Sequence, residues 1–275
     1  MPEVLHGPSA WDESDAETSA FYREVMQTLN DAGLPFLIGG AFAFACFTGI
    51  QRNTKDLDFF IRQAEHAKID DVLRQAGYRT ELAYPHWLAK VYRGDAFIDL
   101  IFNSGNGISP VDDEWFEHAA QCEVLGVNVR IAPAEETLWT KAFIMERERY
   151  DGADVAHLLR MRGHRLDWPR MLRRFGPHWR VLLSHLVLFG FIYPGEREIV
   201  PTWLSDLLIE RLQQESRQPP SQARLCAGTL LSREQYLDDI EQQGYQDARN
   251  TSASTMTPQD VADWTEAIPG RTESR

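Results

Sequence analysis

The sequence contains no hydrophobic run long enough to cross a membrane. A spanning helix needs about 18 or more consecutive apolar residues, whereas the longest candidate, 181–193, contains Ser184 and His185. The first part of the chain is acidic and lacks the basic start and apolar centre of a secretory signal peptide. We therefore expect a cytoplasmic protein with no membrane association.

Cysteine is scarce, and the histidines form no metal-binding motif. Cys46, Cys122 and Cys226 are odd in number, distant in sequence and in no C-x-x-C arrangement. The eight histidines show no H-E-x-x-H or H-x-H pattern and no pairing with cysteine. These absences argue against a zinc site and a disulfide framework, and they indicate reduced thiols in a reducing compartment.

Basic residues are fewer than acidic ones, 28 against 41, so the net charge is −13. Such a protein is not expected to bind nucleic acid over its whole surface, because phosphate contacts require a positive interface. The stretch 146–180 is an exception, with nine arginines and five acids. This local excess could hold a polyanionic acceptor such as tRNA, or the arginines could simply lie over a helical surface.

The order of apolar segments predicts an α/β (α+β) protein with a C-terminal helical extension. Strands are expected at 34–38, 56–61, 87–92, 96–102 and 124–131, with helices at 14–30, 41–47 and 65–75. Helical spacing dominates after Pro133, at 134–147, 153–161, 171–175, 179–191 and 202–214. We predict a mixed central sheet flanked by helices in 1–132 and a helical region packed on it in 133–215. Residues 216–275 should form a linker, one helix at 232–243 and a mobile tail.

Three aspartates in two predicted strands carry the strongest chemical signal. Alternate residues of a strand share a face, so Asp56 and Asp58 point to one side while Leu57 points into the core. Asp99 stands alone among the large apolar residues of 97–102. Neighbouring carboxylates repel unless a cation compensates them, and Mg²⁺ or Mn²⁺ would suit three oxygen ligands. The alternatives are that Asp-x-Asp is only a turn and that Asp99 is a core acid tied to an arginine or a backbone N–H.

A glycine pair precedes the first of these strands. Gly39 and Gly40 follow the apolar strand 34–38 and stand at the start of a predicted helix. Glycines there let a ligand approach the backbone, and a helix N-terminus offers free N–H groups to a phosphate. A plain turn would have the same sequence.

The glycine pair, the helix, the segment Arg-x-Thr-x-Asp-x-Asp and the later lone aspartate together resemble the DNA polymerase β-like nucleotidyltransferase superfamily. The closer resemblance is to its minimal and AbiEii-type toxin branch. It implies nucleotide binding by Gly39, Gly40, Arg52 and Thr54, Mg²⁺ held by Asp56, Asp58 and Asp99, and Asp99 acting as the base.

The resemblance continues beyond the predicted metal site. The segment 133–141 is similar to one whose helix places a lysine, here Lys141, near the nucleotide phosphates, which adds Lys141 to the catalytic candidates. Asp151 and Asp154 either continue the family pattern or serve as N-cap and first-turn acid of the next helix. Ala41 departs from the pattern, because many relatives have Ser or Thr there.

These observations predict a Mg²⁺-dependent enzyme that moves a nucleoside monophosphate from an NTP to an acceptor hydroxyl. RNA, tRNA or a protein is the expected acceptor, and the resemblance also implies a toxin-like role with an antitoxin-like partner. The alternative is a catalytically weak or inactive module of the same fold that binds a nucleotide or a partner, which Ala41 favours. A small-molecule acceptor such as an aminoglycoside is a third possibility.

Overall fold

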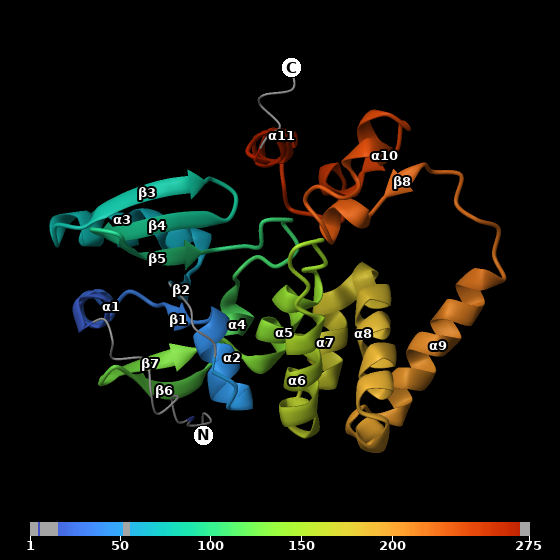
Figure 1. Cartoon of the computed structure of the whole chain (residues 1–275), viewed down its shortest axis with the longest axis horizontal. Helices are drawn as coiled ribbons and strands as arrows, with labels where there is room; N and C mark the ends of the chain where they lie inside the picture. Colours follow the sequence, from blue (N-terminus) through green and yellow to red (C-terminus); the bar gives the residue numbers. More distant parts are fainter. Residues whose placement is uncertain (1–4, 6–15, 52–55, 270–275) are drawn as a thin grey trace. The chain divides into compact units, whose positions relative to one another are not determined.

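The structure is a computed structural model that describes residues 5, 16–51 and 56–269 (Figure 1). It forms two compact units, Met1–Thr137 and Leu138–Arg275, and the boundary falls inside α5 (Ala134–Ala142). Within the described ranges, no helix combines the length and the hydrophobicity that crossing a membrane requires.

The first unit is built on a seven-stranded mixed sheet in the order β3-β4-β5-β2-β1-β7-β6. Its strands are β1 (Leu37–Ile38), β2 (Leu57–Phe60), β3 (Arg79–Tyr84), β4 (Leu88–Arg93), β5 (Ala96–Ile101), β6 (Ala120–Val124) and β7 (Val127–Ile131). β2 runs parallel to β5, and β1 runs antiparallel to β2 and parallel to β7, whereas the remaining pairs are antiparallel. The predicted mixed central sheet is thereby confirmed.

Helices α1 (Ala16–Asp31) and α3 (His66–Gln75) contact each other and the sheet through apolar residues. Leu57 and Phe59 of β2 are buried, as the alternation of the strand predicts. Phe60 points to the opposite face, where Trp115 of α4 (Asp113–Glu117) packs against it with ring centroids 4.9 Å apart. The face that carries Asp58 is therefore covered by α4 at its Phe60 end.

Three elements of the first unit were not predicted: β3, α4 and the β6–β7 hairpin. β3 is an edge strand whose exposed residues show no clean alternation. The single strand predicted at 124–131 is in fact a hairpin, and its turn residues Leu125 and Gly126 have φ of 51° and 79°. Consecutive positive φ values are typical of a tight two-residue hairpin turn.

The second unit consists mainly of the helices predicted after Pro133. They are α6 (Gly152–Arg162), α7 (Trp168–Phe175), α8 (Trp179–Ile192) and α9 (Thr202–Ser216). Leu159, Met171 and Leu182 from three of these helices are completely buried. Short 3₁₀ turns complete both units: η1 (Gln63–Glu65), η2 (Gly163–Arg165), η3 (Gly176–His178), η4 (Pro194–Ile199), η5 (Gly228–Leu230) and η6 (Ala248–Asn250).

The C-terminal part differs from the prediction of one helix and a mobile tail. The helix expected at 232–243 is reduced to α10 (Leu237–Glu241), and β8 (Leu225–Cys226) pairs with β9 (Gln246–Asp247). A further helix, α11 (Pro258–Glu266), lies inside the predicted tail and begins with a capping box formed by Thr257 and Asp260. The ion pair between Arg249 and Asp247, 2.7 Å long, is buried beside these elements. Sequence periodicity did not reveal β8, β9 and α11 because the strands have two residues each and the helix has only nine.

Candidate active site

The structure brings the three predicted aspartates together in the first unit. Asp58 on β2 and Asp99 on β5 are register partners in a parallel pair, and Asp56 immediately precedes β2. One carboxylate oxygen from each lies within 4.8 Å of the others, and all three residues are half-buried. We call Asp56, Asp58 and Asp99 the acid cluster.

A lysine from the neighbouring strand contacts the acid cluster. Lys90 of β4 is the register partner of Asp99, and its Nζ lies 2.6 Å from Asp99 Oδ1. Burial raises the pKa of Asp99; Lys90 opposes this shift, and the nearby Asp56 adds to it. The surroundings of Asp99 are thus compatible with both interpretations of this residue. It forms an ion pair with a basic neighbour, as a core acid would, and it lies beside two other acids, as a metal ligand would.

The glycine pair packs directly on β2. The Gly39 N–H donates to the Asp58 carbonyl at 2.9 Å, and α2 (Gly40–Thr48) begins at the next residue. A Cβ on Gly40, whose φ is +54°, would lie 1.6 Å from Asp58 Oδ2. A Cβ on Gly39 would lie 2.0 Å from the ring of Phe60. Both glycines are therefore required by the strand beneath them, and they place the N–H groups at the start of α2 beside the acid cluster.

The other predicted nucleotide-binding residues, Arg52 and Thr54, lie outside the described residues. Lys141 belongs to the second unit, where its Nζ lies 2.7 Å from Asp154 Oδ2 and 3.1 Å from Asp151 Oδ2. Although burial opposes the shift, Arg149 and Lys141 hold the pKa of Asp151 below its usual range. Asp151 precedes α6 without a side-chain capping hydrogen bond, because its carboxylate faces these two cations.

Lys90 was missed by the sequence reasoning, although a signal for it was present. The predicted strands 87–92 and 96–102 are joined at Gly94-Asp95, and a two-residue turn pairs Arg93 with Ala96. Counting outward from that turn pairs position 90 with position 99, as the structure shows. A charged residue opposite a lone strand aspartate could therefore have been identified.

The donor set of the acid cluster fits a small divalent cation. All three ligands are carboxylates, which are hard oxygen donors, and they converge to distances that one or two ions could bridge. With Lys90 included, the site carries three formal negative charges and one positive charge. Asp56, Asp58 and Asp99 are the residues that would hold Mg²⁺ or Mn²⁺.

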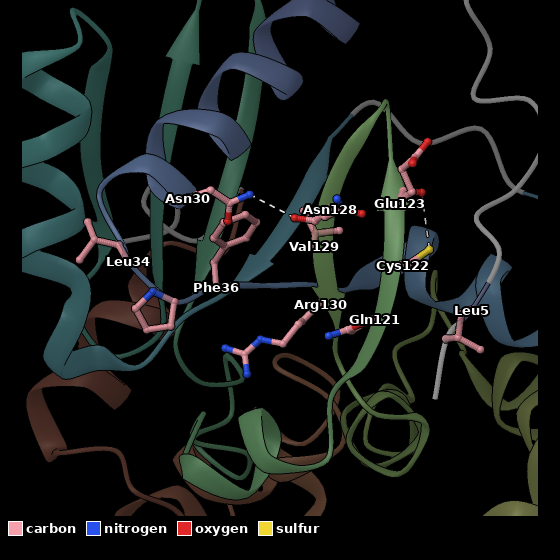
Figure 2. A pocket seen from close by; sticks show the side chains of 11 residues that line it. Leu5, Asn30, Leu34, Phe36, Gln121, Cys122, Glu123, Asn128, Val129 and Arg130 are labelled. Atoms are coloured by element: carbon pink, nitrogen blue, oxygen red, sulfur yellow. Dashed lines mark hydrogen bonds between the residues drawn. The ribbon is translucent and has the colours of Figure 1, made fainter. Parts of the chain in front are cut away.

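A separate pocket of about 650 Å³ lies at the other end of β1 (Figure 2). It is lined by the end of α1, the segment that precedes β1 and both strands of the β6–β7 hairpin. The Asn30 side chain crosses to the Asn128 carbonyl there, and Arg130 also lines the pocket. Gly39 and Gly40 follow β1 whereas this pocket precedes it, and none of its lining residues belongs to the acid cluster.

The chain is similar in sequence to a protein family and in structure to several solved proteins. A family model described as "Uncharacterised nucleotidyltransferase" matches residues 23–179, which is more than half of the chain. No curated protein matches the sequence. The antibiotic-resistance factor ANT(2'')-Ia is 17% identical, with a TM-score of 0.36, over 74% of this chain and 96% of its own.

Two further solved structures are similarly distant. The lincosamide antibiotic adenylyltransferase LnuA is 15% identical, with a TM-score of 0.38, over 52% of this chain and 95% of its own. A tRNA-processing enzyme is 15% identical, with a TM-score of 0.30, over 74% of this chain and 57% of its own. Likenesses this weak carry no argument about substrates, whereas the family match spans the acid cluster, the glycine pair and Lys141. The chain therefore belongs to the family of nucleotidyltransferases that this model describes.

Proposed function

We propose that this protein transfers a nucleoside monophosphate from an NTP to an acceptor hydroxyl in the presence of Mg²⁺ or Mn²⁺. The observation that carries the proposal is the convergence of Asp56, Asp58 and Asp99 within 4.8 Å, beside the N-terminus of α2. The family supplies the reaction class. The acid cluster supplies a place where this chemistry can occur.

In this proposal, different residues bind the triphosphate and accept the proton. The N–H groups at the start of α2 would bind the triphosphate, because a helix N-terminus favours anions. Asp99 would accept the proton of the acceptor hydroxyl. At the same time the hydroxyl oxygen of the acceptor would form a bond to the α-phosphorus, and the bond from that phosphorus to pyrophosphate would break. A bound divalent cation supplies positive charge that stabilises the developing charge on the phosphates.

The acceptor is proposed to be an RNA such as tRNA, or a protein. The arginine-rich stretch 146–180 supports binding of a polyanionic acceptor less than its composition suggested, because several of its arginines form ion pairs within the protein. Arg149, Arg160 and Arg180 pair with Asp151, Glu196 and Glu215. Arg170 is buried. A protein or small-molecule acceptor is thus an equal alternative to RNA in the test below.

The first test measures metal and nucleotide binding together with transfer. Each α-labelled NTP is incubated with Mg²⁺ and total cell RNA, total cell protein or an aminoglycoside, and the labelled product is identified. We expect transfer from at least one NTP, and a rise in melting temperature with millimolar metal and NTP. Asp58→Asn should abolish both, whereas Asp71→Asn, which neutralises an exposed acid of α3, should change neither.

The second candidate function is a nucleotide-binding module that has lost turnover, and Ala41 favours it. Binding without transfer would support this candidate, whereas no metal-dependent thermal shift in the wild type would contradict both. Ala41→Ser introduces a hydroxyl at the position where many DNA polymerase β-like nucleotidyltransferases have Ser or Thr. A gain of transfer in this variant alone would identify Ala41 as the cause of the loss.

A toxin-like role is the finer form of the proposal. It predicts that expression of the wild type arrests growth and that Asp58→Asn relieves the arrest. A neighbouring gene whose product restores growth would identify the antitoxin-like partner. Normal growth at high expression, together with active enzyme, would reject the toxin role and leave the transferase proposal intact.

A further inference from the structure

Lys90, Asp99 and Asp58 form a row across three adjacent strands. β4 pairs with β5 so that Lys90 is opposite Asp99, and β5 pairs with β2 so that Asp99 is opposite Asp58. Directly opposite residues of paired strands point to the same face of a sheet. The three side chains therefore share one face.

Two contacts fix the position of the Lys90 ammonium group. Its Nζ lies 2.6 Å from Asp99 Oδ1 and 4.2 Å from the ring centroid of Phe97, which precedes Asp99 by two residues on the same face of β5. Tyr92 of β4 packs beside Phe97 with ring centroids 6.2 Å apart. The Lys90 and Asp99 side chains are only 23% and 14% exposed, so solvent screens their ion pair weakly.

We propose that Lys90 is a positioning residue for nucleotidyl transfer. By donating to Oδ1 it sets the rotation of the Asp99 carboxylate and leaves Oδ2 as the oxygen presented to a metal ion or to the acceptor hydroxyl. This inference rests on the proposed function, because positioning matters only if Asp99 takes part in the reaction. In this arrangement Lys90 acts on the reaction only through Asp99.

The same geometry gives Lys90 two effects of opposite sign. Its positive charge lies in the acid cluster and disfavours a second cation there, so its removal should strengthen the binding of a divalent ion. Its hydrogen bond holds the carboxylate in place, so its removal should slow transfer, because a displacement of about 1 Å can cost about 100-fold in rate. Only the slower transfer identifies positioning, because a lysine that acted through its charge alone would change the metal affinity without lowering kcat.

The test compares Lys90→Met, Lys90→Arg and Lys68→Met in the full chain. Lys68 is a suitable control because its side chain is 70% exposed on α3. Mn²⁺ affinity is measured by electron paramagnetic resonance without nucleotide, and kcat and KM are measured with an NTP that the wild type uses. For Lys90→Met we expect Mn²⁺ binding about threefold to tenfold tighter, and a kcat at least tenfold lower with KM within threefold. Lys90→Arg should recover most of the kcat, and Lys68→Met should resemble the wild type.

An unchanged kcat in folded Lys90→Met, with or without tighter Mn²⁺ binding, would overturn the inference. If Lys90→Met does not fold, Lys90→Gln replaces it, because its neutral side chain is too short to hold Asp99 Oδ1 as Lys90 does, and it should show the same loss of kcat. A wild-type kcat in folded Lys90→Gln overturns the inference. Failure of the proposed function is distinguishable, since the wild type would then bind Mn²⁺ without transferring a nucleotide.

Discussion

Gly40 contributes to the acid cluster through the side chain that it lacks. Its φ of +54° lies in the left-handed region that glycine adopts most readily. The position that its Cβ would occupy is already filled by Asp58 Oδ2. From the sequence we explained this glycine by the approach of a bound phosphate. The structure adds a second reason, because a side chain at this position would collide with the Asp58 carboxylate.

At this scale we predict that Gly40→Ala disrupts the acid cluster. The new methyl group must displace the Asp58 carboxylate, so Mn²⁺ affinity should fall at least tenfold and stability should fall by about 2–4 kcal/mol. Gly49→Ala is the matched control, because Gly49 has φ +73° and its Cβ would meet nothing within 4 Å. It should cost only the backbone strain, about 1 kcal/mol. Urea unfolding and Mn²⁺ titration measure both quantities, and equal Mn²⁺ affinities in the two variants would contradict the prediction.

At the scale of elements, the β6–β7 hairpin carries an unfavourable turn residue. Among the described residues, Leu125 is the only one other than glycine with a positive φ, which is 51°. It directly precedes Gly126 in the turn. Leucine is rare in this region, whereas asparagine adopts it readily. We predict that Leu125→Asn raises the free energy of unfolding by about 0.5–1 kcal/mol.

The neighbouring glycine provides the opposite test of the same turn. Gly126→Ala has open space for its Cβ but adopts φ of 79°, so it should lower stability by about 1 kcal/mol. Both free energies follow from urea unfolding curves. A stabilising Gly126→Ala, or a destabilising Leu125→Asn, would show that the turn does not have this conformation.

Helices α5 and α6 are linked by the ion pairs of Lys141. Its side chain is 13% exposed, and those of Asp151 and Asp154 are 8% and 3% exposed. Lys141→Met would leave buried carboxylates without this cation, so we predict a loss of about 3–5 kcal/mol of stability. Arg147→Met is the control, because its pair with Glu148 is solvent-exposed and should be worth less than about 1 kcal/mol.

The same variant separates the two roles of Lys141. Transfer is measured on the folded fraction at low temperature, next to the thermal unfolding curve. Loss of transfer in folded Lys141→Met would support the phosphate-contacting role that the resemblance implies. Wild-type transfer in a destabilised variant would assign Lys141 a purely structural role.

At the scale of the whole molecule, one buried and one half-buried histidine in the second unit predict how stability depends on pH. Burial lowers the pKa of His185, whose ring contacts the Ala142 carbonyl at 2.9 Å. Burial also lowers the pKa of His178, which contacts the Ala253 carbonyl at 3.0 Å. As the pH falls through about 6.5, the unfolded chain binds protons that the folded chain does not. Between that pH and its lower folded-state pKa, each histidine can reduce the free energy of unfolding by up to about 1.4 kcal/mol per pH unit.

The measurement is urea unfolding of the wild type and two variants between pH 7.5 and 5.5. His185→Gln keeps a hydrogen-bond donor but cannot titrate, so its stability should fall less steeply on acidification. His118→Gln changes an exposed histidine of the first unit and should keep the wild-type slope. Equal slopes in His185→Gln and the wild type would contradict the assignment.

The sequence by itself determined what depends on local periodicity. Alternation placed Asp56 and Asp58 opposite the buried Leu57, and helical spacing located the main helices of both units. The glycine pair and the lone Asp99 were recognisable because a strand that reads as buried seldom carries a charge without compensation. Each of these signals lies within a few consecutive residues of the chain, so no knowledge of packing was needed to recognise it.

Only the tertiary structure decided which side chains meet. Strand order brings Lys90 to Asp99 and Asp99 to Asp58, and packing of α2 on β2 places Asp58 where the Cβ of Gly40 would be. Cys122 of β6 and burial together raise the pKa of Cys46 of α2, although the two cysteines are distant in sequence. Such partners are set by register and by the packing of remote elements, and their energies depend on burial that no short stretch of sequence contains.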